Sequence, residues 1–459
     1  MATLFATLPT LAQQPTAATP PMGWNSWDAY GLTITEQQFR DNVKVLHEKL
    51  QPFGWKYAVI DEGWFFFNPE DRDKPAKLVY AIDDHGRYVP VPARFPSSAH
   101  PPTGPITGTS VPPTSILLDT TFKPLADYVH AQGLLFGIHI VRGIPRVSVE
   151  RNLPIANSST FTAKDAANTT DACPWDPTNW GVKDTPAGQA WYDSLLQQYS
   201  QWGIDILKVD CIADHPYALG EIRMIRKAID KAVAKTHRPI VLSLSPGPTG
   251  IAHAEEVRSL ANMTRISNDI WDVWAPAKGF PRSIKDQFAL TAAWAPYTRP
   301  GFFPDADMLP FGELRPSPGW AKPRTSLLTL EEEQTQLTLW AIARSPLILG
   351  ANLTLLDAPT LKLLTNKDLL AIDQTAITSW QQTRDGDLVI WVARLPQDHV
   401  AIAFFNLGET PLDADESLTA LLPKLIHTDR ITLTDLWTNQ HPSKLAPIPP
   451  HGTILLETK

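Results

Sequence analysis

The order of local sequence patterns along the chain is the feature that most constrains its fold. Between residues 20 and 375, short apolar runs typical of buried strands alternate with segments whose apolar residues recur at helical spacing. Strands separated by helices indicate a parallel sheet, and eight such units indicate an α/β fold whose sheet closes into a (β/α)8 TIM barrel. The expected strands are residues 22–27, 56–63, 134–141, 204–211, 240–245, 264–269, 302–308 and 347–353.

Local signals support the helices between these strands. Thr35 and Gln38 are spaced as a capping box at the start of one helix, and Pro186 opens another. Gly133 and Gly203 stand where helices are expected to end, each directly before a strand. An open, doubly wound sheet is the alternative to a barrel. Neither a G-x-G-x-x-G segment nor a Walker loop follows the first strand, so the usual nucleotide-binding uses of an open sheet lack support.

Two segments lie outside this pattern. After residue 375 the helical periodicity fades, and short strand-like runs separated by turn residues indicate a C-terminal antiparallel β-sandwich over residues 376–459, which we expect to be structural. Residues 1–19 are small and apolar and then polar, which is typical of the end of a secretory signal or of a flexible arm. We therefore expect a barrel domain over residues 20–375 in a secreted or periplasmic protein.

Charge and cysteine content exclude several classes of protein. The chain has 40 basic and 48 acidic residues, a net charge of −8, and no cluster of Lys and Arg, which argues against nucleic acid or an anionic membrane as the partner. No apolar run is long enough to span a membrane. The two cysteines, Cys173 and Cys211, exclude a disulfide-rich scaffold and a four-cysteine zinc site, and the sequence leaves open whether they pair.

Chemistry-bearing residues are concentrated where the expected strands end, which is where active sites lie in this kind of barrel. Asp61 and Glu62 follow the second strand, and Asp210, Asp269 and Asp307 stand at the ends of the fourth, sixth and seventh. Apolar strands have little reason to end repeatedly in carboxylates unless those groups are used. Two carboxylates in different roles are what glycoside hydrolysis needs, because one must be ionised and the other must hold a proton for the leaving oxygen.

Metal binding is the alternative use of clustered acids. The Asp-Glu pair at 61–62 and the Asp-x-Asp segment at 305–307 contain oxygen ligands that suit a hard cation. However, Lys208 lies two residues before one strand-end acid and Arg265 four residues before another, so cationic side chains already offset the negative charge. We therefore expect neither a metal nor another cofactor. A metal-dependent barrel hydrolase and a non-catalytic sugar-binding barrel are the alternative classes.

Six motifs, in order along the chain, resemble those of glycoside hydrolase family 27, the family of α-galactosidases and α-N-acetylgalactosaminidases. The resemblance covers the chain from about residue 19 onward. It implies a retaining hydrolase built on a (β/α)8 barrel followed by a β-sandwich. The motifs are TPPMGWNSW at 19–27, IDEGW at 60–64, KVD at 208–210, RISND at 265–269, DADML at 305–309 and LWAIARSPL at 339–347.

The resemblance also implies roles for individual residues. Asp210 matches the nucleophile of the family and Asp269 matches its general acid/base, two groups that stand about 5–5.5 Å apart in retaining enzymes. The expected substrate-binding residues are Trp27, Asp61, Glu62, His139, Lys208, Ser245, Arg265 and Asp307, and Arg142, Cys173, Cys211 and Asp272 are further site candidates.

Four departures from the family pattern bear on the choice of sugar. Cys211 sits one position earlier than the usual Cys of the family, and the usual partner position on the loop after the third strand is not Cys. The pair after the second strand is usually Asp-Asp, and the longer side chain of Glu62 carries its carboxylate about 1.5 Å further into the pocket. His139 stands where the family usually has Tyr, and Ser245 stands where typical α-galactosidases have Glu.

We expect an exo-acting α-galactosidase with a carbohydrate substrate. β-L-Arabinopyranosidase, α-N-acetylgalactosaminidase and isomaltose-releasing dextranase are the alternatives within the family. β-L-Arabinopyranose is α-galactose without its hydroxymethyl group, so Glu62 makes that alternative physically sensible. A small side chain at Ser245 resembles the N-acetylgalactosaminidase branch, which needs room for the acetamide group.

Overall fold

The computed structural model describes residues 15–458 except for short internal gaps. The first part of the N-terminal arm expected over residues 1–19 therefore lies outside the described residues. Within the described part of the chain, every helix is too short or too polar to cross a lipid bilayer. The internal gaps are residues 73, 75–76, 100–109, 112–114, 177, 215, 276–279, 316–321 and 427–431.

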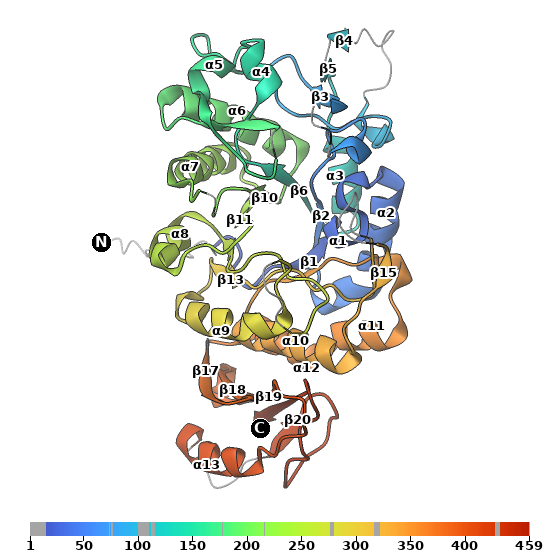
Figure 1. The fold of residues 1–459 in the computed structure, drawn as a ribbon, viewed down its shortest axis with the longest axis vertical. Helices are drawn as coiled ribbons and strands as arrows, with labels where there is room; N and C mark the ends of the chain where they lie inside the picture. The colour runs from blue at the N-terminus through green and yellow to red at the C-terminus, as the bar shows by residue number, and fades with distance from the viewer. Residues whose placement is uncertain are drawn as a thin grey trace, which may run out of the picture.

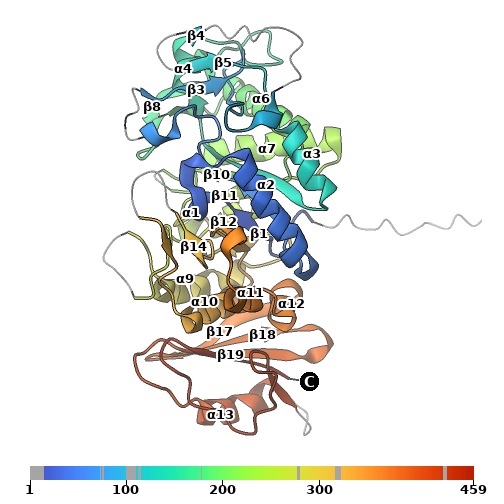
Figure 2. The ribbon, with the colours of Figure 1, turned by 90° about the vertical axis from the view of Figure 1, so that its right-hand side faces the viewer.

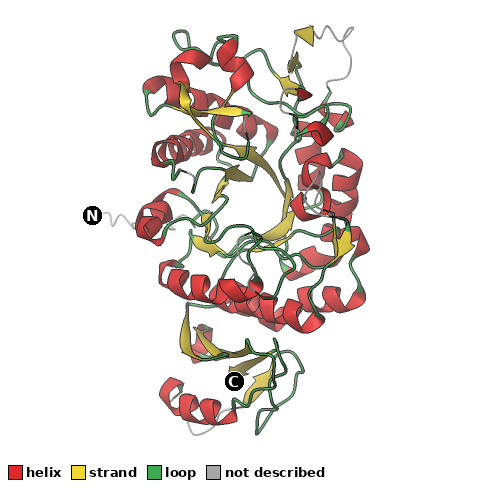
Figure 3. Cartoon of the chain, viewed as in Figure 1, coloured by secondary structure: helices red, strands yellow, loops and turns green. Residues whose placement is uncertain are grey.

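Eight parallel strands form the central sheet, and a ring of helices surrounds it (Figures 1 and 3). Each expected strand range overlaps one of these strands, so the predicted barrel is confirmed. The sheet closes where Leu309, just after the last-but-one strand, pairs with Leu349 of the last. In spatial order the strands are β16 (Leu347–Leu349), β1 (Met22–Asn25), β2 (Tyr57–Ile60), β6 (Leu135–Val141), β10 (Ile206–Asp210), β11 (Val241–Leu244), β12 (Met263–Arg265) and β13 (Phe303–Asp305).

Alternate residues of each strand point into the barrel. These inward residues form an apolar layer, called the plug here, and a polar region at the C-terminal ends of the strands. Val59, Ile206, Val241 and Met263 point inward and pack on one another near the start of their strands. Gly137 of β6 makes room for this layer, because a Cβ atom there would lie 2.3 Å from a methyl carbon of Ile206. Two residues further along each of these strands, the inward position is polar and lies toward the C-terminal end of the barrel: Asp61, Lys208, Ser243 and Arg265.

The helices on the outside of the barrel begin and end at the expected signals. Thr35 caps α2 with the reciprocal bonds of a capping box, Pro186 opens α6, and Gly203 ends it in the left-handed conformation. The barrel helices are α2 (Glu36–Val45), α3 (Lys123–Ala131), α6 (Pro186–Trp202), α7 (Leu219–Thr236), α8 (Ala254–Leu260), α9 (Ile284–Trp294), α10 (Leu330–Ala343), α11 (Ala358–Leu364) and α12 (Lys367–Thr375).

Two excursions extend the barrel beyond its strand ends and lie together at the top of Figure 1. The first follows β2 and contains β3 (Tyr80–Ile82) paired with β5 (Ser115–Leu117). The second, residues 144–182, follows β6. It contains β7 (Ile144–Pro145), α4 (Arg146–Glu150), α5 (Ala163–Ala166), β8 (Ala167–Ala172) and β9 (Asn179–Val182), and its strands have the order β7-β9-β8.

The C-terminal part is a five-stranded antiparallel sheet that lies between the barrel and helix α13 (Asp415–Leu425) (Figure 2). Alternate residues of β18 face opposite sides, so Trp391 belongs to the barrel core and Ile390 packs with α13. Helix α13 and the exposed strand β17 were not anticipated from the sequence. The sheet order is β17 (Thr378–Asp385), β18 (Leu388–Arg394), β19 (Val400–Asn406), β21 (Thr453–Thr458) and β20 (Leu433–Asp435).

Candidate active site

A cavity of about 380 Å³ opens at the C-terminal end of the barrel strands. All ten residues that the sequence analysis assigned to catalysis or substrate binding line it. The four further candidates, Arg142, Cys173, Cys211 and Asp272, do not line it. Residues on seven different strand ends and loops thus meet at one place, because the carboxyl ends of parallel strands share one face of the barrel.

Strand β10 supplies Lys208 and Asp210 to the cavity. They lie two residues apart on the inward face, above the plug residue Ile206, while Leu207 and Val209 point outward into the hydrophobic core. Cys211, the next residue, takes a left-handed backbone conformation with φ of +58°, which ends the strand directly after Asp210.

One oxygen of Asp210 is hydrogen-bonded and the other is not. His139, at the inward position of the neighbouring strand β6, places Nε2 at 3.1 Å from Asp210 Oδ2. Oδ1 is buried and has no hydrogen-bond partner among the described residues. Burial by itself raises the pKa of Asp210, but the hydrogen bond and charge of His139 and the charge of Lys208 together hold that pKa below its usual value.

Asp61, directly after β2, is the anchor for Lys208. Its Oδ2 accepts from Lys208 Nζ at 2.8 Å and from Asn25 Nδ2 at 2.7 Å, and its backbone N–H donates to Ser26 Oγ. Burial opposes ionisation of Asp61, but the charges of His139 and Lys208 hold its pKa far below the usual range. The pair therefore stays charged and fixes both side chains at the floor of the cavity.

On the opposite wall, Arg265 contacts two carboxylates. Its Nη2 lies 3.0 Å from Asp269 Oδ1 and 2.6 Å from Asp307 Oδ2. Burial raises the pKa of Asp307 to about 7, with Arg265 opposing the shift and the charge of Asp269 adding to it. The Asp269 side chain is 39% exposed, so it reaches the open part of the cavity. This wall can hold a proton near neutral pH.

Glu62 and Trp27 complete the predicted lining around the sugar-sized space. Glu62 is buried, and its Oε2 lies 3.4 Å from the guanidinium of Arg72. Trp27 is half-buried, and its backbone N–H donates to the side chain of Asn25 at 2.8 Å. Ser245 is buried at the end of β11, and its hydroxymethyl group is the smallest side chain among the predicted contacts.

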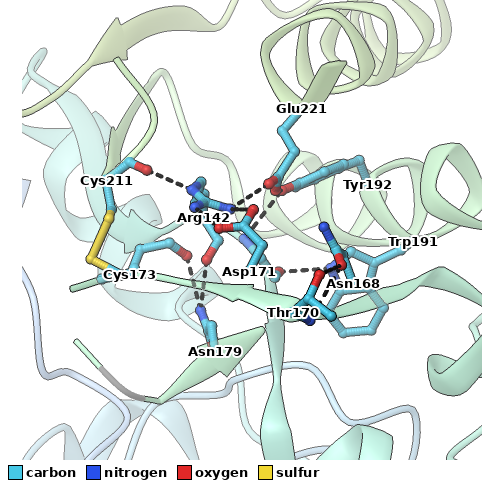
Figure 4. A network of polar contacts seen from close by, with 12 residues as sticks. Arg142, Asn168, Thr170, Asp171, Cys173, Asn179, Trp191, Tyr192, Cys211 and Glu221 are labelled. Carbon is cyan, nitrogen blue, oxygen red and sulfur yellow. Dashed lines mark hydrogen bonds and ion pairs between the residues drawn. A yellow bond between two sulfur atoms is a disulfide. The ribbon is translucent and has the colours of Figure 1, made fainter. Parts of the chain in front are cut away.

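Arg142 lies behind the cavity in a buried polar network (Figure 4). It donates to the carbonyl oxygen of Cys211 at 2.6 Å, forms two hydrogen bonds with Asp171 and pairs with Glu221 at 2.6 Å. The disulfide Cys173–Cys211 lies beside this network and joins the excursion after β6 to the residue that follows Asp210. These groups thus attach the excursion to the end of β10.

Asp272 also lies outside the cavity lining. It is buried, and both its oxygens contact the guanidinium of Arg324, at 2.5 and 2.8 Å. Its Oδ2 also accepts from the backbone N–H of Leu327. The arrangement holds the segment around Arg324 against the loop that follows Asp269.

Several lining residues were missed by the sequence analysis. Arg72 and Trp175 come from the two excursions, where no strand-end position marks them. Asp28 follows Trp27 and carries a raised pKa because it is buried near Asp307, and its position beside a strand-end motif was a usable signal. The other missed residues are Pro246, Asn268, Ile270, Trp271, Phe280 and Met308. In the described part of the chain, no group of three or more His, Cys, Asp or Glu is arranged to hold a metal ion.

Comparison with protein families finds two matches along the chain. Residues 178–375 match the model described as alpha galactosidase A, and residues 385–458 match the alpha galactosidase C-terminal beta sandwich domain. Among curated relatives, alpha-galactosidase 2 of Arabidopsis thaliana is 26% identical over 426 residues, which are 92% of this chain and 83% of that one. Alpha-galactosidase A of Cellvibrio japonicus is 26% identical and covers 86% of this chain and 78% of its own.

Solved structures give stronger similarity over the whole length. A GH27 β-L-arabinopyranosidase from Geobacillus stearothermophilus is 36% identical with a TM-score of 0.81, and the match covers 96% of this chain and 97% of that one. A protein from Bacillus halodurans, whose assignment as an α-N-acetylgalactosaminidase is itself a proposal, is 32% identical with a TM-score of 0.76, covering 97% and 99% of the two chains.

Proposed function

The chain belongs to glycoside hydrolase family 27 and is a glycoside hydrolase that acts on carbohydrate, and from this premise we propose that it hydrolyses β-L-arabinopyranosides by a retaining mechanism. Asp210 is the nucleophile and Asp269 is the general acid/base. The observation that carries the choice of sugar is the buried carboxyl group of Glu62 at the side of the cavity away from Asp269.

In the first step, a carboxylate oxygen of Asp210 attacks the anomeric carbon C1. The hydrogen bond from His139 to Oδ2 orients the carboxylate. As the bond between C1 and the Asp210 carboxylate forms, the bond from C1 to the leaving oxygen breaks, and Asp269 transfers its proton to that oxygen. The lowered pKa of Asp210 keeps the attacking group ionised.

In the second step, the Asp269 carboxylate removes a proton from water, and the water oxygen attacks C1. The ester bond to Asp210 breaks and the carboxylate returns to its initial state. Two displacements on the same carbon leave its configuration unchanged. Arg265 contacts both Asp269 and Asp307, so its charge stabilises whichever of the two carboxyl groups is ionised while the proton moves.

The strand order orients the sugar ring. In the eight-stranded barrel, β2 stands four positions from β12, so Glu62 faces the wall that carries Asp269. With C1 beside Asp210 and Asp269, ring atoms C4 and C5 point toward Asp61 and Glu62. A galactoside carries a hydroxymethyl group on C5 and an arabinopyranoside carries none. The longer side chain of Glu62 occupies the space which that group needs, and this supports an arabinopyranoside.

α-Galactosidase, which the sequence analysis favoured, is the second candidate. The curated relatives at about 26% identity are α-galactosidases, and both family models carry that name. The higher identity of 36% to a β-L-arabinopyranosidase, together with Glu62, supports the arabinopyranoside instead. The small side chain of Ser245 supports a test of α-N-acetylgalactosaminide as well.

The test is a comparison of kcat/KM for three aryl glycosides: β-L-arabinopyranoside, α-D-galactopyranoside and α-D-N-acetylgalactosaminide. We expect the first to exceed the second by about tenfold or more, the effect of one misfitting carbon substituent in a closed pocket. Glu62→Asp shortens the side chain and moves the ratio toward the galactoside. Proton NMR at early times follows the first sugar anomer released, which is β for retention on the β-arabinopyranoside.

Asp210→Asn keeps the shape of the nucleophile and removes its charge, so kcat falls by at least about 10³-fold. Asp127→Asn is the matched control, because that carboxylate is exposed and pairs only with Lys123 among the contacts observed for it. Full activity of Asp210→Asn, or release of the opposite anomer, contradicts the mechanism. A wild-type preference for the galactoside contradicts the choice of sugar and leaves the mechanism standing.

We further propose that the chain divides into a catalytic barrel over residues 20–375 and a C-terminal domain over residues 376–459. The change from parallel barrel to antiparallel sheet between α12 and β17 supports this division. The second family model, which begins at residue 385, agrees with it. Expression of residues 376–459 alone tests whether that part folds independently.

We also propose that the protein is secreted or periplasmic. The Cys173–Cys211 disulfide supports this location, because such bonds persist in oxidising compartments and are rare in the cytosol. Fractionation of the native host, with the thiol content of the purified protein measured in parallel, tests the proposal. Free thiols on both cysteines in the native protein would contradict it.

A further inference from the structure

The excursion after β6 is attached to the barrel at several points around Asp176. Asp171 forms two hydrogen bonds with Arg142, and Cys173 is joined to Cys211 by the disulfide. On the other side, Asn179 donates from Nδ2 to the carbonyl oxygens of Val141 and Arg142 at 3.1 Å. The backbone that carries Asp176 is thereby held at the end of β10, on the side of Asp210.

Asp176 is 1% exposed, and its carboxyl group meets that of Glu62. Its Oδ1 accepts from the backbone N–H of Thr178 at 2.7 Å. No N–H or hydroxyl group of the described residues donates to its Oδ2 or to Oε1 of Glu62, and both atoms are buried. The Asp176 carboxyl group acts on that of Glu62 through its charge and through a side-chain contact, and two buried acids in contact attract each other only when one of them carries a proton.

The charges around the pair favour one shared proton. Arg72 lies 3.4 Å from the other oxygen of Glu62, and Asp210 adds negative charge from the β10 side. Burial raises the pKa of Glu62, Arg72 opposes the shift, and Asp176 adds to it. Tyr80 and Tyr88 face Asp176 from the first excursion and stay neutral, because burial raises their pKa. With one proton, Glu62, Asp176 and Arg72 sum to zero charge.

We propose that Asp176 is a positioning residue for sugar selection: it shares a proton with Glu62 and so holds the Glu62 carboxyl group as the wall that closes the cavity at the C5 side of the ring. The proposal rests on the proposed arabinopyranosidase function. It also accounts for glutamate at position 62, because an aspartate there is shorter by about 1.5 Å and loses contact with Asp176.

The neighbouring side chain links this wall to the rest of the cavity. Trp175, directly before Asp176, lines the cavity with 39% of its surface exposed, whereas Asp176 stands behind the lining. A change at Asp176 therefore acts on substrate through Glu62 and does not remove a group that touches the sugar. We expect its effect in KM and in the choice between sugars more than in kcat.

The test measures kcat and KM of wild type, Asp176→Asn and Asp176→Ala on the aryl β-L-arabinopyranoside and α-D-galactopyranoside between pH 5 and 9. In Asp176→Ala, Glu62 loses its partner, so KM for the arabinopyranoside rises about tenfold and the preference over the galactoside falls by a similar factor, the effect of one hydrogen bond to a charged group. In Asp176→Asn, the amide donates to the Glu62 carboxylate and the preference is kept.

The pH profile separates a shared proton from a merely structural contact. In the wild type, KM rises at alkaline pH as the pair loses its proton and two carboxylates repel each other. In Asp176→Asn no proton is needed, so KM stays flat over the same range. Glu62→Gln provides the reverse substitution: its amide donates to Asp176 as the protonated acid does, and KM again becomes independent of pH while the ratio between sugars is kept.

Asp171→Ala is the matched control, because it loosens the same excursion without touching the carboxyl pair. We expect it to lower the thermal midpoint and to leave the ratio between sugars unchanged. The proposed function is tested by the wild type alone, through its ratio of kcat/KM for the two aryl glycosides. If the wild type prefers the arabinopyranoside but Asp176→Ala keeps both the ratio and the pH dependence of KM, the positioning role is wrong. If Asp176→Ala does not fold, Glu62→Gln provides the test. Loss of the preference for the arabinopyranoside over the galactoside in that variant overturns the proposal.

Discussion

Replacing His139 with phenylalanine tests how the proposed nucleophile is kept ionised. Asp210 is buried, and burial alone raises its pKa. The imidazole Nε2 at 3.1 Å provides the hydrogen bond that counters this effect, aided by the charges of His139 and Lys208. Phenylalanine fills the ring volume of the buried histidine but donates nothing, so the pKa of Asp210 rises.

The size of the effect follows from the bond that is lost. A hydrogen bond to a charged group contributes about 1.5–3 kcal/mol, and one pKa unit corresponds to about 1.4 kcal/mol. The pKa of Asp210 therefore rises by about 1–2 units in His139→Phe. Because the depressed pKa keeps Asp210 ionised at acid pH in the wild type, the variant loses activity first on the acid side. The acid limb of kcat/KM moves to higher pH by the same 1–2 units.

The assay is the pH dependence of kcat/KM on the best aryl glycoside, since this quantity reports groups of the free enzyme. His139→Gln is the matched variant, because its amide nitrogen reaches about as far as the imidazole Nε2 and still donates, without the positive charge. Its acid limb lies between those of the wild type and His139→Phe. An acid limb of His139→Phe within about 0.3 units of the wild type refutes the reasoning, since the donor is then not what holds Asp210 ionised.

Two further predictions concern the attachment of the excursion. Changing Cys173 and Cys211 together to serine opens a loop with a sequence separation of 38 residues. The loop-closure relation gives a loss of about 4 kcal/mol in the free energy of unfolding. Denaturant titration of both proteins with and without reductant measures the loss, which the reductant reproduces in the wild type only. Arg142→Met removes the cation that pairs with Asp171 and with the buried Glu221 and costs about 3–5 kcal/mol in the same titration, and a loss below 1 kcal/mol would contradict a structural role for the network.

The barrel and the residues around its mouth were predictable from the sequence because they follow local periodicity. A strand of a barrel exposes every second residue to the interior, so Lys208 and Asp210 share a face with Ile206. Once the strands are placed, residues at their C-terminal ends must converge. The ten predicted contacts accordingly lie around one cavity, although their roles stay predictions.

Helix α13 and strand β17 show the limit of local patterns. The buried residues of α13 that pack with the sheet are Leu418, Leu421 and Leu425, which have helical spacing over only about two turns. They lie in a region where turn residues dominate. Strand β17 is largely exposed and has almost no alternation of apolar residues. Its own sequence therefore does not predict a strand, and it is extended because it pairs with β18.

Contacts between the two excursions could not be predicted from the sequence for a different reason. Arg72 and Asp176 lie in loops far apart along the chain, and no period relates them to Glu62. Whether Cys173 reaches Cys211 depends on how the excursion after β6 folds back over β10. The sequence by itself determined the barrel and the chemistry at its strand ends, because alternation along each strand specifies which side chains face inward. Only the tertiary structure decided what stands behind Glu62, because that contact depends on the path of two long excursions in space.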